Sequence, residues 1–132
     1  MKNNKGFTLI ELLAVIVILA IIALIATPLT INVINDAKLK ADENSASGVL
    51  DGARLYYAEQ MLKDTPNLGS EASPLYVSAL SLSGEAPSNA STAKITFGAD
   101  GKISISDMKF KNGGCFKITN GKVEKGTACP TN

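Results

Sequence analysis

The sequence predicts an α+β protein in which one long N-terminal helix packs on a small antiparallel sheet of three to four strands. Residues 7–26 form a mainly apolar run that contains a single charge, Glu11. Apolar residues then recur mostly at three- and four-residue steps as far as residue 61, which is the spacing of one helix face. From residue 94 onward apolar and polar residues alternate between turn sequences, which is typical of β-hairpins.

The apolar run is long enough to cross a membrane. As a helix it would extend about 30 Å, which matches the hydrocarbon core of a bilayer. Lys2 and Lys5 precede it, and the positive-inside rule predicts that basic residues of this kind stay in the cytoplasm. We therefore expect a single-pass precursor in the inner or cytoplasmic membrane, with its N-terminus inside and most of the chain outside.

Glu11 is unusual within this run. A carboxylate among apolar side chains costs a few kcal/mol unless it lies near the interface or finds a partner. A cation within hydrogen-bonding distance would stabilise it, and loss of one partner of such a pair is costly. Glu11 also lies in the first turns of the helix, where the macrodipole favours negative charge. An isolated membrane anchor would therefore be more stable without Glu11.

The residues around Glu11 resemble a known signature. Gly6-Phe7-Thr8-Leu9-Ile10-Glu11, behind a short basic leader and ahead of an apolar helix with Pro28, is similar to the prepilin signature of type IV pilins and pseudopilins. The resemblance covers about the first thirty residues and implies the pilin fold. It implies three parts: a leader peptide (1–6) that is removed, a transmembrane and filament-core helix (7–28), and an extracytoplasmic globular domain (29–132) that includes the amphipathic half of the helix.

The resemblance also implies roles for single residues. A prepilin peptidase would cut between Gly6 and Phe7 and N-methylate the new amino terminus at Phe7. Glu11 would pair with the amino group of a neighbouring subunit's Phe7, and Pro28 falls where family members kink or melt the helix on assembly. The implied partners are further copies of the chain in a helical homopolymer, the peptidase, and a pilus assembly platform with its ATPase. The implied function is that of a structural subunit of a type IV pilus, used for adhesion, motility or DNA uptake.

Four other interpretations account for part of the N-terminal pattern. A pseudopilin of a type II secretion or competence machine would carry the same signature, and a monomeric membrane-anchored binding domain would carry a similar helix. A plain uncleaved anchor does not explain Glu11, because a charge within an isolated membrane helix is costly. A secretory signal peptide needs small residues one and three places before the cut, whereas cuts after Ala26 or Ala23 would place Leu24 or Ile21 at the third position.

After Pro28 the helix is predicted to continue to residue 63 with an apolar face. That face comprises Ile34, Ala37, Ala41, Ala46, Val49, Leu50, Ala53, Tyr57 and Met61. Gly48 and Gly52 lie on one side of it, which indicates either a close approach by the sheet or a neighbouring subunit, or local softness. Turn formers at residues 64–70 end the helix. In the connecting region up to residue 93, residues 77–82 are expected to form a short helical turn, and the sequon at Asn89 is a motif common by chance.

The C-terminal third is predicted to be the sheet. Residues 94–98 and 102–106 form one hairpin, residues 108–110 suggest a further alternating stretch, and residues 115–119 and 122–125 flank the turn Asn120-Gly121. This turn fixes the register, with Thr119 opposite Lys122, Ile118 opposite Val123, and Cys115 opposite Gly126. The candidates for packing against the helix are Phe97, Ile103, Ile105, Phe116 and Ile118.

Cys115 and Cys129 are the only cysteines and lie in the extracytoplasmic part. In an oxidising compartment such a pair indicates one disulfide, the alternative being two separate thiols. The bond would stabilise the fold by roughly 3 kcal/mol and hold the tail, residues 130–132, on the sheet. A disulfide near the C-terminus recurs among pilins, which agrees with the resemblance.

Composition argues against catalysis. The chain has no histidine, no evident nucleophile beside a base and no cluster of metal ligands, so we expect no enzyme, no catalytic residue, no metal and no cofactor. Charge is uneven: residues 36–93 hold eight acidic and four basic residues, and residues 94–132 hold three acidic and seven basic ones. The strand lysines are expected to form a solvated face; they are Lys102, Lys109, Lys117, Lys122 and Lys125. Contact with acidic surfaces of neighbouring subunits, or with DNA phosphates, is the alternative, although no motif supports nucleic-acid recognition.

Overall fold

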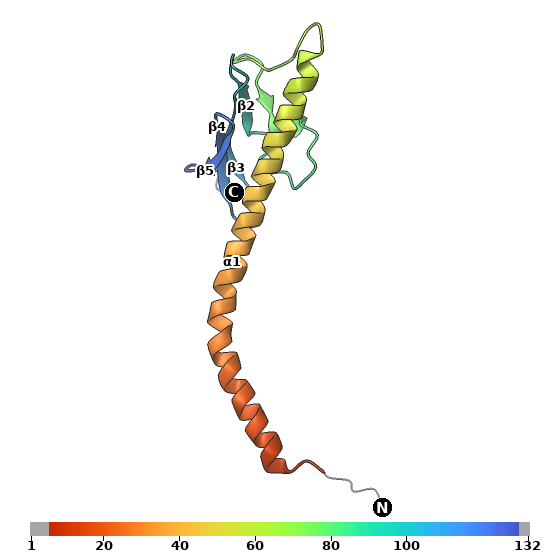
Figure 1. Ribbon diagram of the computed structural model, residues 1–132. Coiled ribbons are helices and arrows are strands. Elements are labelled where there is room, and N and C mark those ends of the chain that lie inside the picture. The colour runs from red at the N-terminus through yellow and green to blue at the C-terminus, as the bar shows by residue number, and fades with distance from the viewer. Residues whose placement is uncertain (1–5, 130–132) are drawn as a thin grey trace, which may run out of the picture. The chain divides into compact units, whose positions relative to one another are not determined.

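The computed structural model describes residues 6–129, which form one long helix, one short 3₁₀ helix and five strands (Figure 1). The elements are α1 (Leu9–Met61), β1 (Leu75–Tyr76), η1 (Val77–Ala79), β2 (Lys94–Phe97), β3 (Ile103–Lys109), β4 (Cys115–Thr119) and β5 (Lys122–Lys125). The α+β class predicted from the sequence is therefore confirmed. Lys2, Lys5 and the tail from residue 130 lie outside the described residues.

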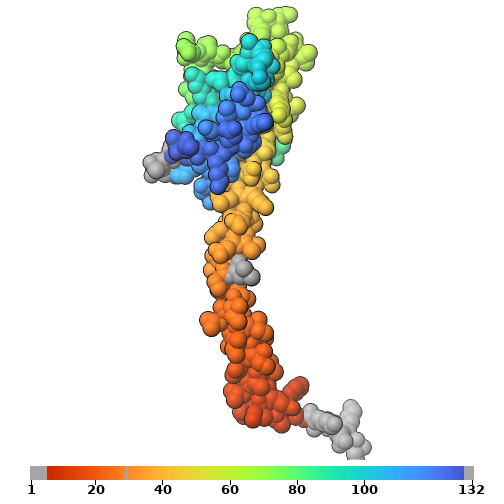
Figure 2. Space-filling model, turned by 60° about the vertical axis from the view of Figure 1, so that its left-hand side comes forward, coloured from red at the N-terminus to blue at the C-terminus, as the bar shows by residue number. Residues whose placement is uncertain are grey.

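The chain divides into two units, the first ending at Ala37 and the second beginning at Lys38. The first unit holds the apolar part of α1, whose described side chains stand exposed around a single helix (Figure 2). The second unit holds the rest of α1, the connecting segment and the sheet. Within residues 6–129 every buried hydrophobic side chain belongs to this second unit, so the second unit alone has a core.

The buried face of α1 begins at Asp42 and ends at Gln60. Its residues are Asp42, Ala46, Val49, Leu50, Gly52, Ala53 and Gln60. The apolar face predicted from periodicity was too long, because Ile34, Ala37 and Ala41 are exposed and Met61 is 47% exposed. Helical periodicity reports that one side is apolar, but it does not report how far the surface that covers this side extends.

The helix ends two residues earlier than predicted, at Met61. The N–H of Lys63 donates to the carbonyl of Gln60 at 3.0 Å, so the last turn tightens to a three-residue spacing. The Gln60 side-chain oxygen then accepts the backbone N–H of Asn67 at 3.0 Å, and the hydroxyl of Tyr56 donates to the Asn67 carbonyl. These bonds fold the predicted turn, residues 64–70, back against the end of α1.

Five antiparallel strands follow one another in the order β1-β2-β3-β4-β5, one more than the three to four predicted. The additional strand is β1, which is only two residues long and pairs Leu75 with Ile95 and Tyr76 with Lys94. Two residues are too few to show a period, which is why the sequence did not reveal this strand. The short helical turn expected nearby is present as η1.

The final hairpin has the predicted register, with Thr119 paired to Lys122 and Ile118 to Val123. Asn120 and Gly121 both have positive φ, 52° and 78°, as a two-residue type I′ turn requires. The stretch predicted separately at residues 108–110 is largely the end of β3, which is longer than expected. There Ile105 pairs with Ile118 and Met108 with Phe116, so two residues of β3 lie opposite one of β4 and form a bulge.

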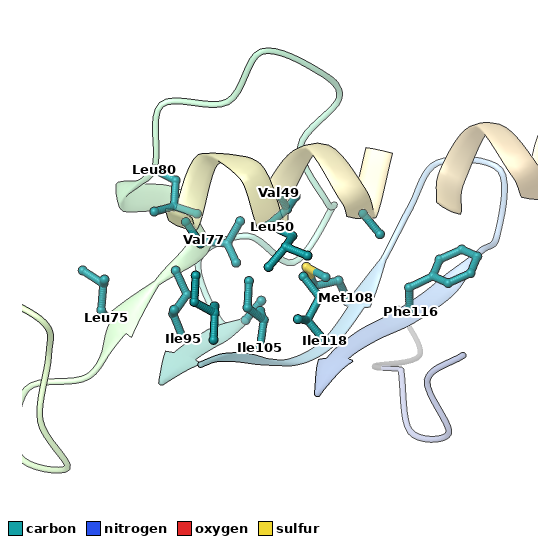
Figure 3. Packing of buried hydrophobic residues seen from close by; sticks show 14 of the residues in the cluster. Val49, Leu50, Leu75, Val77, Leu80, Ile95, Ile105, Met108, Phe116 and Ile118 are labelled. Carbon is teal, nitrogen blue, oxygen red and sulfur yellow. The ribbon is translucent and has the colours of Figure 1, made fainter. Parts of the chain in front are cut away.

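The core lies between α1 and one face of the sheet (Figure 3). Leu50 of α1 faces Ile105 and Ile118 of the sheet in this view. Four of the five predicted core residues are buried, namely Ile103, Ile105, Phe116 and Ile118. Phe97 is only partly buried, because it packs at the margin of the core against the rings of Tyr56 and Tyr57.

The two helix glycines have different surroundings. A Cβ on Gly52 would lie 2.9 Å from Cδ2 of Leu82 and 3.4 Å from the Ser81 carbonyl, whereas a Cβ on Gly48 would meet nothing within 4 Å. Within the subunit, the predicted close approach is therefore present at Gly52 and absent at Gly48. The residues that approach Gly52 belong to the connecting segment and not to the sheet.

The side chain of Asn89, in the connecting segment, forms hydrogen bonds with the backbone of β3 where a neighbouring strand would otherwise do so. Its Nδ2 donates to the carbonyl of Asp107 and its Oδ1 accepts the N–H of Lys109, both at 2.9 Å. These backbone groups lie beyond the reach of β2, which pairs with β3 only from Ile103 to Ile105. The side-chain amide of Asn89 is thus engaged in the fold.

Candidate functional site

The described chain begins with a short irregular segment before α1. Gly6, Phe7 and Thr8 are exposed and belong to neither helix nor strand, and Leu9 is the first helical residue. A Cβ on Gly6 would meet no atom within 4 Å. The peptide bond between Gly6 and Phe7 is thus accessible, and a protease could bind it without unwinding α1.

Thr8 and Glu11 cap the start of α1 reciprocally. The backbone N–H of Thr8 donates to Oε2 of Glu11 at 2.9 Å, and the backbone N–H of Glu11 donates to Oγ1 of Thr8 at 3.4 Å. This is a capping box, in which side-chain oxygens satisfy amide groups that the first helical turn leaves without partners. This cap was not predicted, although Thr-x-x-Glu ahead of an apolar run is its sequence signature.

Glu11 keeps acceptor capacity beyond this cap. Among residues 6–129, its second oxygen, Oε1, accepts no hydrogen bond and its carboxylate forms no ion pair. No other charged residue occurs in the sequence from residue 6 to residue 35. The carboxylate can therefore cap its own helix and bind a cation from another molecule at the same time.

The apolar run that follows is uncovered. Large side chains along α1 are more than half exposed, among them Leu12, Leu13, Ile16, Ile18, Leu19, Ile21 and Ile22. By length and composition, α1 is apolar enough to cross a membrane. An apolar surface of this extent does not persist in water and indicates burial against lipid or protein.

Pro28 lies inside α1, and the helix continues through it. Proline has no N–H, so the carbonyl of Leu24 loses its usual donor four residues later. The hydroxyl of Thr27 donates to the Ala23 carbonyl at 2.7 Å, and that of Thr30 donates to the Thr27 carbonyl at 2.9 Å. The segment predicted to loosen is thus helical here, with one weakened turn supported by threonine hydroxyls.

The predicted disulfide is present between Cys115 and Cys129, with the Cα atoms 5.9 Å apart. Gly126 donates its N–H to the Cys115 carbonyl at 2.9 Å, in the register predicted from the hairpin. The N–H of Thr127 donates to Oδ1 of Asp107 at 3.2 Å. Hydrogen bonds and the disulfide together hold residues 126–129 against the sheet.

Asp42 is a buried carboxylate that the sequence pattern did not reveal. It is 1% exposed and is the first buried residue of α1. Its Oδ1 accepts Nδ2 of Asn112 and its Oδ2 accepts the N–H of Gly114, both at 2.8 Å. A Cβ on Gly114 would lie 2.6 Å from Asp42, so only glycine fits there. Asp42 thus fixes the β3–β4 loop to the helix.

Within the described part of the chain, no group of three potential metal ligands comes together. Two open depressions of about 210 and 290 Å³ are present, one along β2 beside residues 68–71 and one between α1 and residues 79–81. The candidate functional site is therefore the start of α1, where Thr8 and Glu11 form the capping box beside the accessible Gly6–Phe7 bond.

A family model, described as the prokaryotic N-terminal methylation motif, matches residues 1–27. No curated protein and no solved structure matches the chain. The matched residues include the accessible peptide bond, the capping box and most of the uncovered apolar run.

Proposed function

Residues 1–27 carry the N-terminal methylation motif of type IV prepilins and pseudopilins, and from this premise we propose that the chain is a type IV pilin. It is made as a membrane-anchored precursor and polymerises into a filament on the cell surface. The motif marks a family of structural subunits, and it implies processing by a prepilin peptidase and assembly into pilus-type polymers.

The observation that carries the proposal is the uncovered apolar half of α1. From Leu9 to Ala26 each side chain is exposed, and the second unit completes its core without them. Such a helix can be buried in a bilayer first and among other copies of itself later, because both surroundings are apolar. A filament core of packed helices is the arrangement in which no part of this surface meets water.

Glu11 supplies register in this proposal. Once the leader is removed, the new amino group at Phe7 is a cation that a neighbouring subunit can present to Oε1 of Glu11. Methylation of this amine leaves its charge in place, so the pair survives processing. In apolar surroundings an unpaired carboxylate is costly, so only those packings of helices that bring a Phe7 amine to Glu11 are stable.

Processing divides the chain into the proposed parts. Residues 1–6 are the cytoplasmic leader, residues 7–28 the membrane and filament-core helix, and residues 29–132 the extracytoplasmic domain with the amphipathic half of α1. The peptidase cuts at the accessible Gly6–Phe7 bond. An assembly platform and its ATPase then extract the subunit, and the weakened turn at Pro28 lets the helix adjust as it leaves the bilayer.

Two features favour a pilin over a pseudopilin of a secretion or competence machine. The connecting segment between α1 and β2 is long, and the Cys115–Cys129 disulfide holds the C-terminal end on the sheet. A cross-linked domain of this kind suits the exposed coat of a filament that projects from the cell. Long surface filaments in electron micrographs support the pilin role, and their absence from cells that need the protein for secretion supports the pseudopilin role.

The proposal is tested on protein sheared from the cell surface. We expect filaments whose subunit begins at Phe7, with a mass that reveals methylation and one disulfide. Intact mass measurement and N-terminal sequencing check both at once. A subunit that retains residues 1–6 and stays monomeric in the membrane would overturn the proposal and favour an anchored binding domain, and a start near Thr27 would identify a signal peptide.

A further inference from the structure

The second unit carries a group of exposed lysines around the Asp42 contact. Lys38 precedes Asp42 by one helical turn, and Lys111 is adjacent to Asn112, which donates a hydrogen bond to Asp42. Lys125 is adjacent to Gly126, whose N–H donates to the carbonyl of Cys115. All three lysines are exposed, and none forms an ion pair within residues 6–129. We call these residues, Lys38, Lys111 and Lys125, the base patch.

The opposite end of the same unit is acidic. Asp64 follows the end of α1, and Glu71 lies just beyond Gly69, whose N–H donates to Asn67. Both carboxylates are exposed and form no ion pair within the described chain. Leu62, two residues before Asp64, is also exposed. We call these residues, Leu62, Asp64 and Glu71, the tip patch.

Nearby residues of opposite charge lower the net charge of each patch without reversing its sign. Glu43 is exposed next to Asp42, Glu124 is exposed next to Lys125, and the Asp107 carboxylate accepts the N–H of Thr127. At the other end Lys63 is paired with Glu59 at 2.9 Å, and Lys94 lines the same depression as Glu71. From residue 64 to residue 93 the sequence has three acidic residues and no basic one.

The two patches of one copy cannot meet. Asp42 and Gln60, which mark the two ends of the unit, are eighteen residues apart along α1, or about 27 Å. The screening length at physiological salt is about 8 Å, so their mutual attraction within a copy is small. Opposite charges at opposite ends instead favour contact between copies.

We propose that the base patch of one subunit contacts the tip patch of a second copy, and that this contact sets the axial stagger between the globular domains. This rests on the proposed filament, in which all helices run parallel. Parallel copies in register would place like charges side by side, whereas a shift by the length of the domain brings Lys111 and Lys125 to Asp64 and Glu71. The copy shifted in this way is a more distant neighbour in the filament than the copy whose Phe7 amine reaches Glu11, because Phe7 and Glu11 are only about 6 Å apart along a helix. Such a head-to-tail contact is heterologous and leaves both ends free to continue, as an open polymer requires.

The first test is zero-length carbodiimide cross-linking of intact sheared filaments, because it joins only amines and carboxylates in contact. We expect amide links from Asp64 or Glu71 to a base-patch lysine. Mixed filaments of ¹⁴N- and ¹⁵N-labelled subunits show by mass that the links join two copies. Links between Glu59 and Lys63, which are 2.9 Å apart in one copy, are the positive control.

The second test reverses charge. The double substitution Lys111→Glu and Lys125→Glu should reduce sheared filament mass roughly fivefold at physiological salt, and Asp64→Lys with Glu71→Lys in the same chain should restore it. Lys122→Glu, at an exposed position of β5 opposite Thr119 and outside both patches, is the matched control and should have little effect.

Three results overturn the inference. Filaments that lack these cross-links but contain the Glu59–Lys63 link overturn it alone, as do charge reversals without effect. Reversals that leave filaments intact but abolish binding of double-stranded DNA assign the base patch to nucleic acid. Absence of filaments from the wild type overturns both this inference and the proposed function.

Discussion

The two units of the chain differ in whether their apolar side chains are buried by the chain itself. In the second unit apolar residues from α1 and all five strands bury one another, and every buried side-chain polar atom of the described residues has a hydrogen-bond partner. In the first unit the apolar side chains cover nothing and are covered by nothing within the described chain. The second unit can therefore fold by its own contacts, whereas the first reaches its stable surroundings only with lipid or other copies.

This contrast separates folding from assembly along one helix. Substitutions after Asp42 should change the stability of the subunit, and substitutions before Ala37 should change polymerisation with little effect on the domain. The predictions below test whether that separation holds, beginning with the largest expected effect.

Replacement of Glu11 by alanine should abolish assembly. Loss of one partner of a buried ion pair costs about 3 kcal/mol, enough to weaken each subunit contact about a hundredfold. Cleavage after Gly6 and the urea midpoint of the domain should stay unchanged, since Glu11 contacts neither the bond nor the core. The yield of sheared filaments measures the effect, with Glu43→Ala, which removes an exposed carboxylate of the second unit, as control. Normal filament yield in Glu11→Ala would remove the pairing hypothesis.

Removal of the disulfide should destabilise the domain. The double variant Cys115→Ala, Cys129→Ala loses a cross-link between residues 14 apart, which is worth about 3 kcal/mol in the chain-entropy model. Urea unfolding followed by tyrosine fluorescence in detergent measures the change. A midpoint equal to that of the wild type would show that Asp107 and the strand contacts alone hold residues 126–129.

Loss of the Asp42 carboxylate should have a somewhat smaller effect on the same transition. Asp42→Ala leaves the N–H of Gly114 and the amide of Asn112 without a buried acceptor, at a cost of about 2 kcal/mol. Asp42→Asn keeps one acceptor and should lose less. Glu43→Ala, at the exposed neighbouring position, is the control. If both Asp42 variants behaved like Glu43→Ala, the β3–β4 loop would not depend on this contact.

The helix glycines should respond differently to alanine. Gly48→Ala should stabilise the subunit by about 1 kcal/mol, because alanine is the better helix former and the site is open. Gly52→Ala should gain less, since its Cβ meets Leu82 and the Ser81 carbonyl. Urea midpoints compare the two. A stabilised Gly48→Ala subunit that assembles poorly would show that another copy approaches the helix at Gly48.

The smallest expected effect concerns pH. The hydrogen bond from the Lys102 ammonium, with its charge 2.7 Å away, lowers the pKa of the Asp100 carboxyl. A carboxyl whose folded pKa lies below its unfolded pKa stabilises the fold at neutral pH, and this contribution is lost as pH falls through the folded value. The stability difference between wild type and Asp100→Asn should therefore narrow between about pH 7 and pH 3. Both groups are exposed, so the difference is small, and a constant difference would show that the pair contributes nothing.

Much of this protein followed from local rules in the sequence. The apolar run, the long helix and its end near Met61 follow from composition and periodicity, and Asn120-Gly121 fixes the register of β4 and β5 because only two residues make the turn. The only two cysteines gave the disulfide. Even the capping box could have been predicted from Thr8 and Glu11, since both partners lie within one helical turn.

The features decided by tertiary structure join residues far apart in the chain. Asp42 is bonded across 70 and 72 residues to Asn112 and Gly114, and Asn89 across 18 and 20 residues to β3. The strand β1 exists only because Leu75 reaches Ile95. Periodicity could say that α1 has an apolar side, but the place where burial begins depends on where the β3–β4 loop meets the helix. A polar residue is buried when a distant partner satisfies it, and no local pattern records that partner.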